Sequence, residues 1–326
     1  MRLVFAGSPA AAVPSLRALA AGEHDVVAVL TRDDTPQGRR RVLTPTPVAV
    51  EAERLGLPVV KARRITDEVA DRIRELDADL GVIVAFGALL REPVLSTPRL
   101  GWVNLHFSLL PRWRGAAPVQ RALMAGDRVT GAAVFQLVPE LDAGDVYGVH
   151  EHPLRGDETA GELLDELAAS GAGLLARVVD DLAEGRAVGV AQAGPVTTAP
   201  KLTLDDGALD LDRPADEVLD RHRGATPEPG SHLPLGSGRL KVLEARATSD
   251  DEPGLEPGRP ELRGRRLVVG TGTRPVELVR VQPPGKKAMA AADWWRGLPG
   301  DAAPVLLPEP PARPGIPAST PPGAPA

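Results

Sequence analysis

The first half of the chain alternates short apolar runs with segments in which apolar residues recur every three or four positions. Short runs bounded by turn residues are typical of buried strands, and the three-to-four spacing is typical of amphipathic helices. The predicted strands are 2–6, 25–31, 58–60, 80–86 and 101–107, and the predicted helices are 10–21, 47–55 and 66–76. This alternation predicts an α/β fold with an open, mostly parallel, Rossmann-like sheet covered by helices on both faces. Ligands bind such sheets beyond the carboxyl ends of the strands.

The hydrophobic pattern changes after Asp145. The sequence predicts a strand at 146–154 and then a long helix at 159–184 with a continuous apolar face. Thr159 precedes Glu162 by three positions, which is the spacing of a capping box at a helix N-terminus. We expect this helix to close the first domain.

Three further parts are expected after that helix. Residues 187–206 lack sustained periodicity and are interpreted as a linker. Short strands such as 239–245 and 265–272 predict a smaller, β-rich, OB-like domain. From residue 299 onward Pro, Ala and Gly dominate, and such a composition buries little surface. The predicted organisation is a catalytic domain at 1–186, the linker at 187–206, a C-terminal domain at 207–298 and a disordered tail at 299–326.

The composition narrows the class of protein. The 326 residues carry a formal charge of -6, which argues against a protein that binds nucleic acid by bulk attraction and leaves local basic patches as the alternative. The absence of cysteine excludes disulfides, thiolate catalysis and common structural zinc sites. No apolar stretch approaches the ~18 residues of a membrane span. We therefore expect a cytoplasmic protein without membrane contact.

Several common catalytic motifs are missing. The turn after the first strand, AGSPAA, contains a single glycine at Gly7 and lacks the G-x-G-x-x-G pattern of dinucleotide sites. The sequence contains no phosphate-binding P-loop, and no histidine has a helical partner at i+4 that would indicate a metal site. Hydride transfer, kinase activity and metal catalysis are therefore disfavoured, and no metal is expected.

The stretch NLHFSLLPRWRGAAP at 104–118 is dense in polar chemistry. Asn104 and His106 are two positions apart on a predicted strand, so their side chains point to the same face. An amide donor beside a titratable imidazole suits a developing oxyanion together with a proton transfer. A carboxylate that orients the imidazole would complete the set, and the loop at 137–145 offers Glu140, Asp142 and Asp145. A tight turn at Gly144 would aim the Asp142 side chain inward, so Asp142 is the favoured candidate for the carboxylate that orients His106.

These motifs resemble the folate-dependent formyltransferases, and in particular those that act on methionyl-tRNA. The resemblance spans about residues 1–298 and is carried by SPAAAVPSL, RDDTPQGRRRVLTPTPV, VAFGALL, NLHFSLLPRWRGAAP, LDAGD and PPGKKAM. It implies a catalytic trio of Asn104, His106 and Asp142. It also implies that the SLLP turn contacts the folate, and we place the pterin in a slot beside it. The residues expected to bind folate are Phe86, Gly87, Leu89, Ser108, Leu109, Leu110 and Pro111.

The resemblance implies formyl transfer from 10-formyltetrahydrofolate to the α-amino group of methionine on initiator tRNA. On this interpretation the oxyanion is stabilised by Asn104 and by protonated His106, with Asp142 supporting that charge, and the chain acts as a monomer. One alternative is a formyltransferase for a small amine, such as glycinamide ribonucleotide or an amino sugar nucleotide. Another is an RNA-binding protein with an idle formyl site.

The acidic chain needs local basic residues to hold tRNA. Residues 33–47 are interpreted as a loop too polar for a strand, and they carry three arginines. By resemblance, this loop wedges into the acceptor stem of the tRNA. Residues 201–300 contain 16 Lys plus Arg and 16 Asp plus Glu, so this part of the chain has no net charge and is not basic overall. The predicted tRNA contacts are Arg39, Arg40, Arg41, Arg263, Arg265, Arg266, Lys286 and Lys287.

Overall fold

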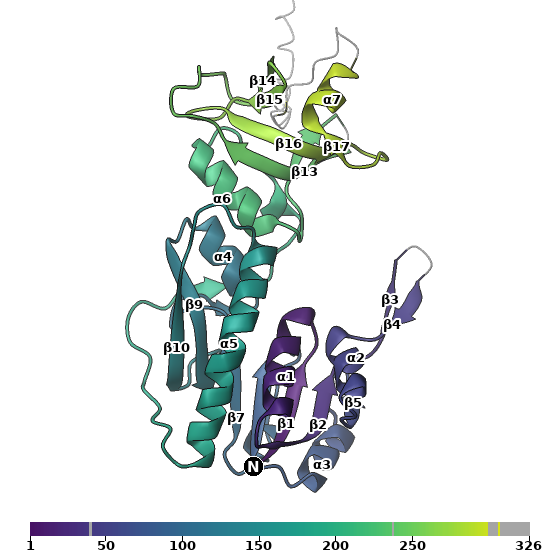
Figure 1. Ribbon diagram of the computed structural model, residues 1–326, viewed down its shortest axis with the longest axis vertical. Helices are drawn as coiled ribbons and strands as arrows, with labels where there is room; N and C mark the ends of the chain where they lie inside the picture. The colour runs from purple at the N-terminus through teal and green to yellow at the C-terminus, as the bar shows by residue number, and fades with distance from the viewer. Residues whose placement is uncertain (39–40, 237, 299–305, 307–326) are drawn as a thin grey trace, which may run out of the picture.

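A seven-stranded sheet forms the first half of the molecule in a computed structural model that describes residues 1–38, 41–236, 238–298 and 306 (Figure 1). The strands follow the order β10-β9-β7-β6-β1-β2-β5, in which the last five are parallel and β9 pairs antiparallel with both β7 and β10. Their bounds are β1 (Arg2–Gly7), β2 (Asp25–Thr31), β5 (Val59–Lys61), β6 (Leu80–Val84), β7 (Trp102–His106), β9 (Val129–Gln136) and β10 (Val146–Pro153). The mostly parallel α/β sheet predicted from the alternation is confirmed.

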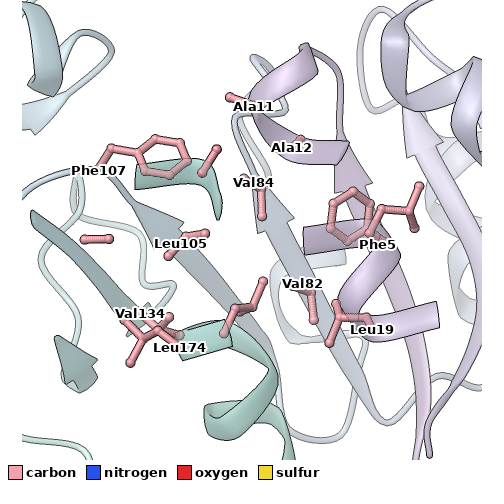
Figure 2. Close-up of a cluster of buried hydrophobic side chains, with 14 of the residues drawn as sticks. Phe5, Ala11, Ala12, Leu19, Val82, Val84, Leu105, Phe107, Val134 and Leu174 are labelled. Atoms are coloured by element: carbon pink, nitrogen blue, oxygen red, sulfur yellow. The ribbon is translucent and has the colours of Figure 1, made fainter. Parts of the chain in front are cut away.

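Helices cover both faces of this sheet, and β1 shows why. Leu3 and Phe5 face one hydrophobic cluster, whereas Val4 and Ala6 face the other, as the two-residue period of a strand requires. The first cluster includes side chains of α1 (Val13–Ala21), α2 (Pro47–Arg54) and α5 (Ala160–Ala183), and the second includes those of α3 (Asp67–Glu75). Figure 2 shows part of the first cluster, between α1 and α5.

The long helix α5 begins as the sequence predicts. The Thr159 side chain accepts a hydrogen bond from the backbone N–H of Glu162, and the Glu162 carboxylate accepts one from the N–H of Thr159. Both otherwise unsatisfied donors at the helix start are therefore paired. Leu163 and Leu167 are fully buried on the face that packs on the sheet, whereas Leu164 is only partly buried.

The C-terminal half is built around an antiparallel sheet of the order β12-β13-β16-β15-β14, with β17 beside β16. The strands are β12 (His232–Leu235), β13 (Gly238–Ala247), β14 (Pro260–Arg263), β15 (Arg266–Val269), β16 (Val276–Gln282) and β17 (Met289–Ala290). Two helices that were not expected accompany it, α6 (Ala215–Ala225) and α7 (Ala291–Arg296). The expectation of a smaller β-rich unit is confirmed.

Helix α6 joins the two halves. It packs against α4 (Pro118–Met124), where Gly224 approaches so closely that a Cβ atom would lie 2.5 Å from the Met124 side chain. An ion pair of 2.7 Å between Arg121 and Asp206 lies at the same junction. The C-terminal half is therefore attached to the first half by the packing of α6 against α4 (Figure 1).

Residues 33–47 differ from the expectation of a loop too polar for a strand. They contain an antiparallel hairpin of β3 (Thr35–Gln37) and β4 (Val42–Thr44) that projects from the sheet (Figure 1). The two strands are exposed and pair only with each other, so their formation depends on backbone hydrogen bonds and needs no apolar face. Arg39 and Arg40 lie outside the described residues.

Residues 187–206 are held more tightly than a linker requires. Val190 forms an antiparallel bridge with Val146 of β10, and β11 (Thr198–Ala199) pairs with β8 (Arg114–Gly115). The short pairings escaped the sequence analysis because segments of one or two residues have no hydrophobic period.

Leu306 also departs from the expected behaviour of the tail. Its side chain is completely buried in the core of the C-terminal sheet, and its backbone N–H donates to the carbonyl of Gly258 at 3.0 Å. The rest of 299–326 lies outside the described residues. In the part of the chain that the structure describes, no helix has the length and apolar character to cross a membrane.

Candidate active site

A cavity of about 750 Å³ lies beyond the carboxyl ends of β6 and β7. Its walls come from segments far apart in the sequence: 85–90 after β6, 104–107 at the end of β7, 114–118, the 137–142 loop and 198–200. This is the position at which parallel α/β sheets bind ligands.

Asn104 and His106 both line the cavity, as their two-residue spacing on β7 predicts. The Oδ1 atom of Asn104 is buried and has no hydrogen-bond partner among the described residues. A buried acceptor without a partner is costly in an otherwise folded protein, and this one is placed where a substrate donor can satisfy it.

The backbone carbonyl of Trp113 fixes the tautomer of His106. The Nε2 atom lies 2.9 Å from this carbonyl oxygen, which can only accept, so Nε2 carries the hydrogen. In the neutral ring, Nδ1 is then an unprotonated acceptor. Trp113 adopts a left-handed φ of 61°, and its backbone N–H and indole N–H are held by Thr197 and Asp127, each at 2.8 Å.

Asp142 is the carboxylate that the structure brings to His106. Its Oδ2 accepts a hydrogen bond from the Gly115 N–H at 2.8 Å and lies 3.9 Å from His106 Nδ1. Asp142 is buried and lines the cavity, whereas Glu140 and Asp145 are exposed and do not.

A close contact between Gly144 in this loop and Gln136 at the end of β9 supports the loop. A Cβ atom at Gly144 would lie 1.8 Å from the backbone oxygen of Gln136, so only glycine fits there. The turn expected at Gly144 is thus required by close backbone contact, and the left-handed φ of 46° falls on Asp142 instead.

Burial lowers the pKa of His106 below its usual value of 6.5, and the opposing effects of the Asp142 charge and the Trp113 carbonyl do not offset it. The imidazole is therefore neutral at neutral pH before substrate binds.

The residues expected to bind folate fall into two groups. Phe86, Gly87 and Leu89 line the cavity, and Leu89 is largely exposed there. The Ser108–Pro111 turn does not line it. Instead the Ser108 hydroxyl donates to the Arg112 carbonyl at 2.6 Å, so the turn shapes the backbone that leads to Trp113.

Sequence reasoning missed part of the cavity wall. Arg114 and residues 198–200 line it, although the latter were assigned to a linker. The Arg-Gly pair at 114–115 belongs to the NLHFSLLPRWRGAAP motif, but nothing in the sequence indicates that 198–199 pairs with it.

The predicted basic contacts differ in their availability. Arg263 and Arg266 both pair with Glu252, at 3.0 Å, and Glu252 is nearly buried. Arg265 and Arg41 are exposed. Lys286 and Lys287 are exposed in the turn after β16.

Comparison with known proteins identifies the family of the chain. Residues 1–179 match the family described as formyl transferase, and residues 201–299 match the formyl transferase C-terminal domain. The chain belongs to the formyl transferase family. It is 61% identical over 302 residues to a methionyl-tRNA formyltransferase of Leifsonia xyli, covering 93% of this chain and 99% of that protein.

A second relative and a solved structure extend the comparison. The methionyl-tRNA formyltransferase of Clavibacter sepedonicus is 59% identical over 298 residues, covering 91% of this chain and 97% of that protein. An N-formyltransferase from Helicobacter canadensis, solved with folinic acid and dTDP-3-aminofucose, superposes with a TM-score of 0.66 at 14% identity, over 85% of this chain and 98% of that one. At this identity the superposition supports the fold alone.

Proposed function

We propose that this protein transfers the formyl group of 10-formyltetrahydrofolate to the α-amino group of methionine on initiator tRNA. The observation that carries the proposal is the convergence of Asn104, His106 and Asp142 on one cavity, in a chain whose relatives are methionyl-tRNA formyltransferases over nearly their whole length.

His106 is the proton acceptor in the proposed reaction. The amine nitrogen attacks the formyl carbon, a C–N bond forms, and the formyl oxygen becomes an oxyanion. The amine proton moves to Nδ1 of neutral His106, since Nε2 already donates to Trp113. Asp142, 3.9 Å from Nδ1, stabilises the imidazolium that results. The imidazolium then returns the proton to N10 of the folate as the old C–N bond breaks.

Asn104 is assigned to the oxyanion and the attacking amine. Its amide N–H donates to the oxyanion, and its unpartnered Oδ1 accepts from the amine. One preorganised donor of this kind contributes roughly 2.7–4 kcal/mol of barrier reduction. No step requires a metal ion.

We assign the pterin to the apolar wall formed by Phe86, Gly87 and Leu89. The Ser108–Pro111 turn, which is not part of the cavity wall, acts through the backbone that it shapes. A folate-derived formyl donor is also in keeping with the family.

For the tRNA we propose two contacts on the side where the parallel strands have their carboxyl ends, beyond which the cavity lies. The hairpin β3–β4 and the C-terminal sheet both rise from that side of the catalytic half (Figure 1). Arg39, Arg40 and Arg41 belong to the hairpin segment, and guanidinium groups pair well with phosphates. In the C-terminal half Arg265, Lys286 and Lys287 are exposed for this role, whereas the carboxylate of Glu252 competes for Arg263 and Arg266.

The assay is incubation with 10-formyltetrahydrofolate labelled in the formyl group. We expect the label to appear on initiator methionyl-tRNA and not on glycinamide ribonucleotide or an amino sugar nucleotide. Label on a small amine alone would replace the proposed substrate, and tRNA binding without transfer to any acceptor would indicate an idle site. We further propose that the protein acts as a cytoplasmic monomer, which cell fractionation and sedimentation test.

A further inference from the structure

The side chain of Gln192 connects two parts of the cavity wall. Its Oε1 accepts from Nε and Nη2 of Arg114, at 3.1 and 2.6 Å. Its Nε2 donates to the backbone carbonyls of Asp142 and Gly144, at 2.8 and 2.9 Å. A guanidinium only donates and a carbonyl only accepts, so one orientation of the amide satisfies all four bonds.

We infer that Gln192 is a positioning residue for the proposed formyl transfer: it holds the loop that carries Asp142 at the distance at which Asp142 acts on His106. This inference rests on the proposed function. Among the described residues, the Asp142 side chain accepts one hydrogen bond, from the Gly115 N–H, and its backbone adopts a left-handed φ of 46° that a non-glycine residue rarely keeps without support.

Gln192 is not needed to hold its own segment in place. Val190 is tied to Val146 by two backbone hydrogen bonds, of 2.8 and 2.9 Å, and β11 is paired with β8. Removal of the Gln192 side chain therefore leaves both attachments of the segment intact. What it removes is the support of the Asp142 loop and of the Arg114 guanidinium.

The other functional assignments leave this amide unused. Gln192 does not line the cavity and bonds Asp142 through its backbone carbonyl, so it acts through its neighbours. A small displacement of a reacting group, of about 1 Å, costs on the order of a hundredfold in rate. We therefore expect Gln192→Ala to lower kcat by about that factor while the KM for the folate donor stays within about threefold.

A second variant separates the two halves of the amide. Gln192→Glu keeps an acceptor for Arg114 but places a carboxylate oxygen against two carbonyls and loses both donated bonds. If the Asp142 loop is what matters, Gln192→Glu is about as slow as Gln192→Ala. Val196→Ala is the matched control, because Val196 is 56% exposed on the same segment and lies outside the cavity wall.

The closing experiment measures hydrogen exchange at the Gly115 amide together with kcat and thermal stability. We expect Gly115 protection to fall in Gln192→Ala and Gln192→Glu, the thermal midpoint to stay near wild type, and Val196→Ala to change none of the three. Wild-type kcat in Gln192→Glu, or unchanged Gly115 protection, overturns the inference. If the wild-type protein formylates no amine, the proposed function fails, and Gly115 exchange alone still decides whether Gln192 holds Asp142.

Discussion

Leu306 offers a quantitative test of how the end of the chain is held. Leu306→Ala removes three carbon atoms from a site with no solvent exposure, between side chains of the C-terminal core. At about 0.8 kcal/mol per buried carbon the transfer loss is about 2.4 kcal/mol, and the cavity left behind brings the total into the range of about 2–5 kcal/mol. For a domain of roughly 100 residues this lowers the thermal midpoint by about 10 °C or more.

Scanning calorimetry of the full chain is the assay, because it separates the two halves if they unfold independently. The control is Leu243→Ala in β13, where the leucine is 36% exposed and a loss under about 1 kcal/mol is expected. If Leu306→Ala shifts the midpoint no more than Leu243→Ala does, the side chain contributes nothing to the core. The expectation that the tail at 299–326 buries little surface would then hold for this residue as well.

Three further predictions follow from the proposed site and from burial. His106→Ala, Asn104→Ala and Asp142→Ala should each lower kcat at least about a hundredfold in folded protein, with effects that do not add; near-normal turnover of His106→Ala would refute its role. Burial lowers the pKa of His222 to about 4, below the usual 6.5 of an unfolded chain. The folded protein should therefore keep its full free energy of unfolding above pH 6.5 and lose on the order of 3 kcal/mol of it as the pH falls toward 4. His222→Gln should make the free energy of unfolding less dependent on pH over this range. Alanine at 39–41 should weaken activity on methionyl-tRNA and flatten its salt dependence without changing folate affinity, and an unchanged salt slope would leave the C-terminal basic residues as the contact.

The sheet was predictable because each strand carries its own signal. Runs such as 25–31 are apolar, bounded by turn residues and buried on both faces, so their pattern is local. The pairing of Asn104 with His106 was predictable for the same reason, since both lie on one strand.

Contacts between distant segments were not predictable. The tautomer of His106 depends on the carbonyl of Trp113, the lowered pKa depends on total burial, and Gln192 reaches Asp142 across 50 residues of sequence. These features depend on contacts between segments that are distant in sequence, so they cannot be predicted from the local pattern of residue types. The buried Leu306 is similar, because one leucine in a Pro-rich segment has no periodic partner.

The path of residues 190–200 limits how this protein can be divided and recombined. The family assignments leave 180–200 between two matched regions, as though a new C-terminal domain could be joined anywhere in that interval. Yet this stretch supplies part of the cavity wall and is hydrogen-bonded to β8, so it belongs with the first half in any chimera. A hybrid that exchanges the C-terminal domain should therefore take every residue up to Pro200 from the protein that supplies the first half. In a hybrid joined at 186, the cavity wall would combine residues from two different parent proteins.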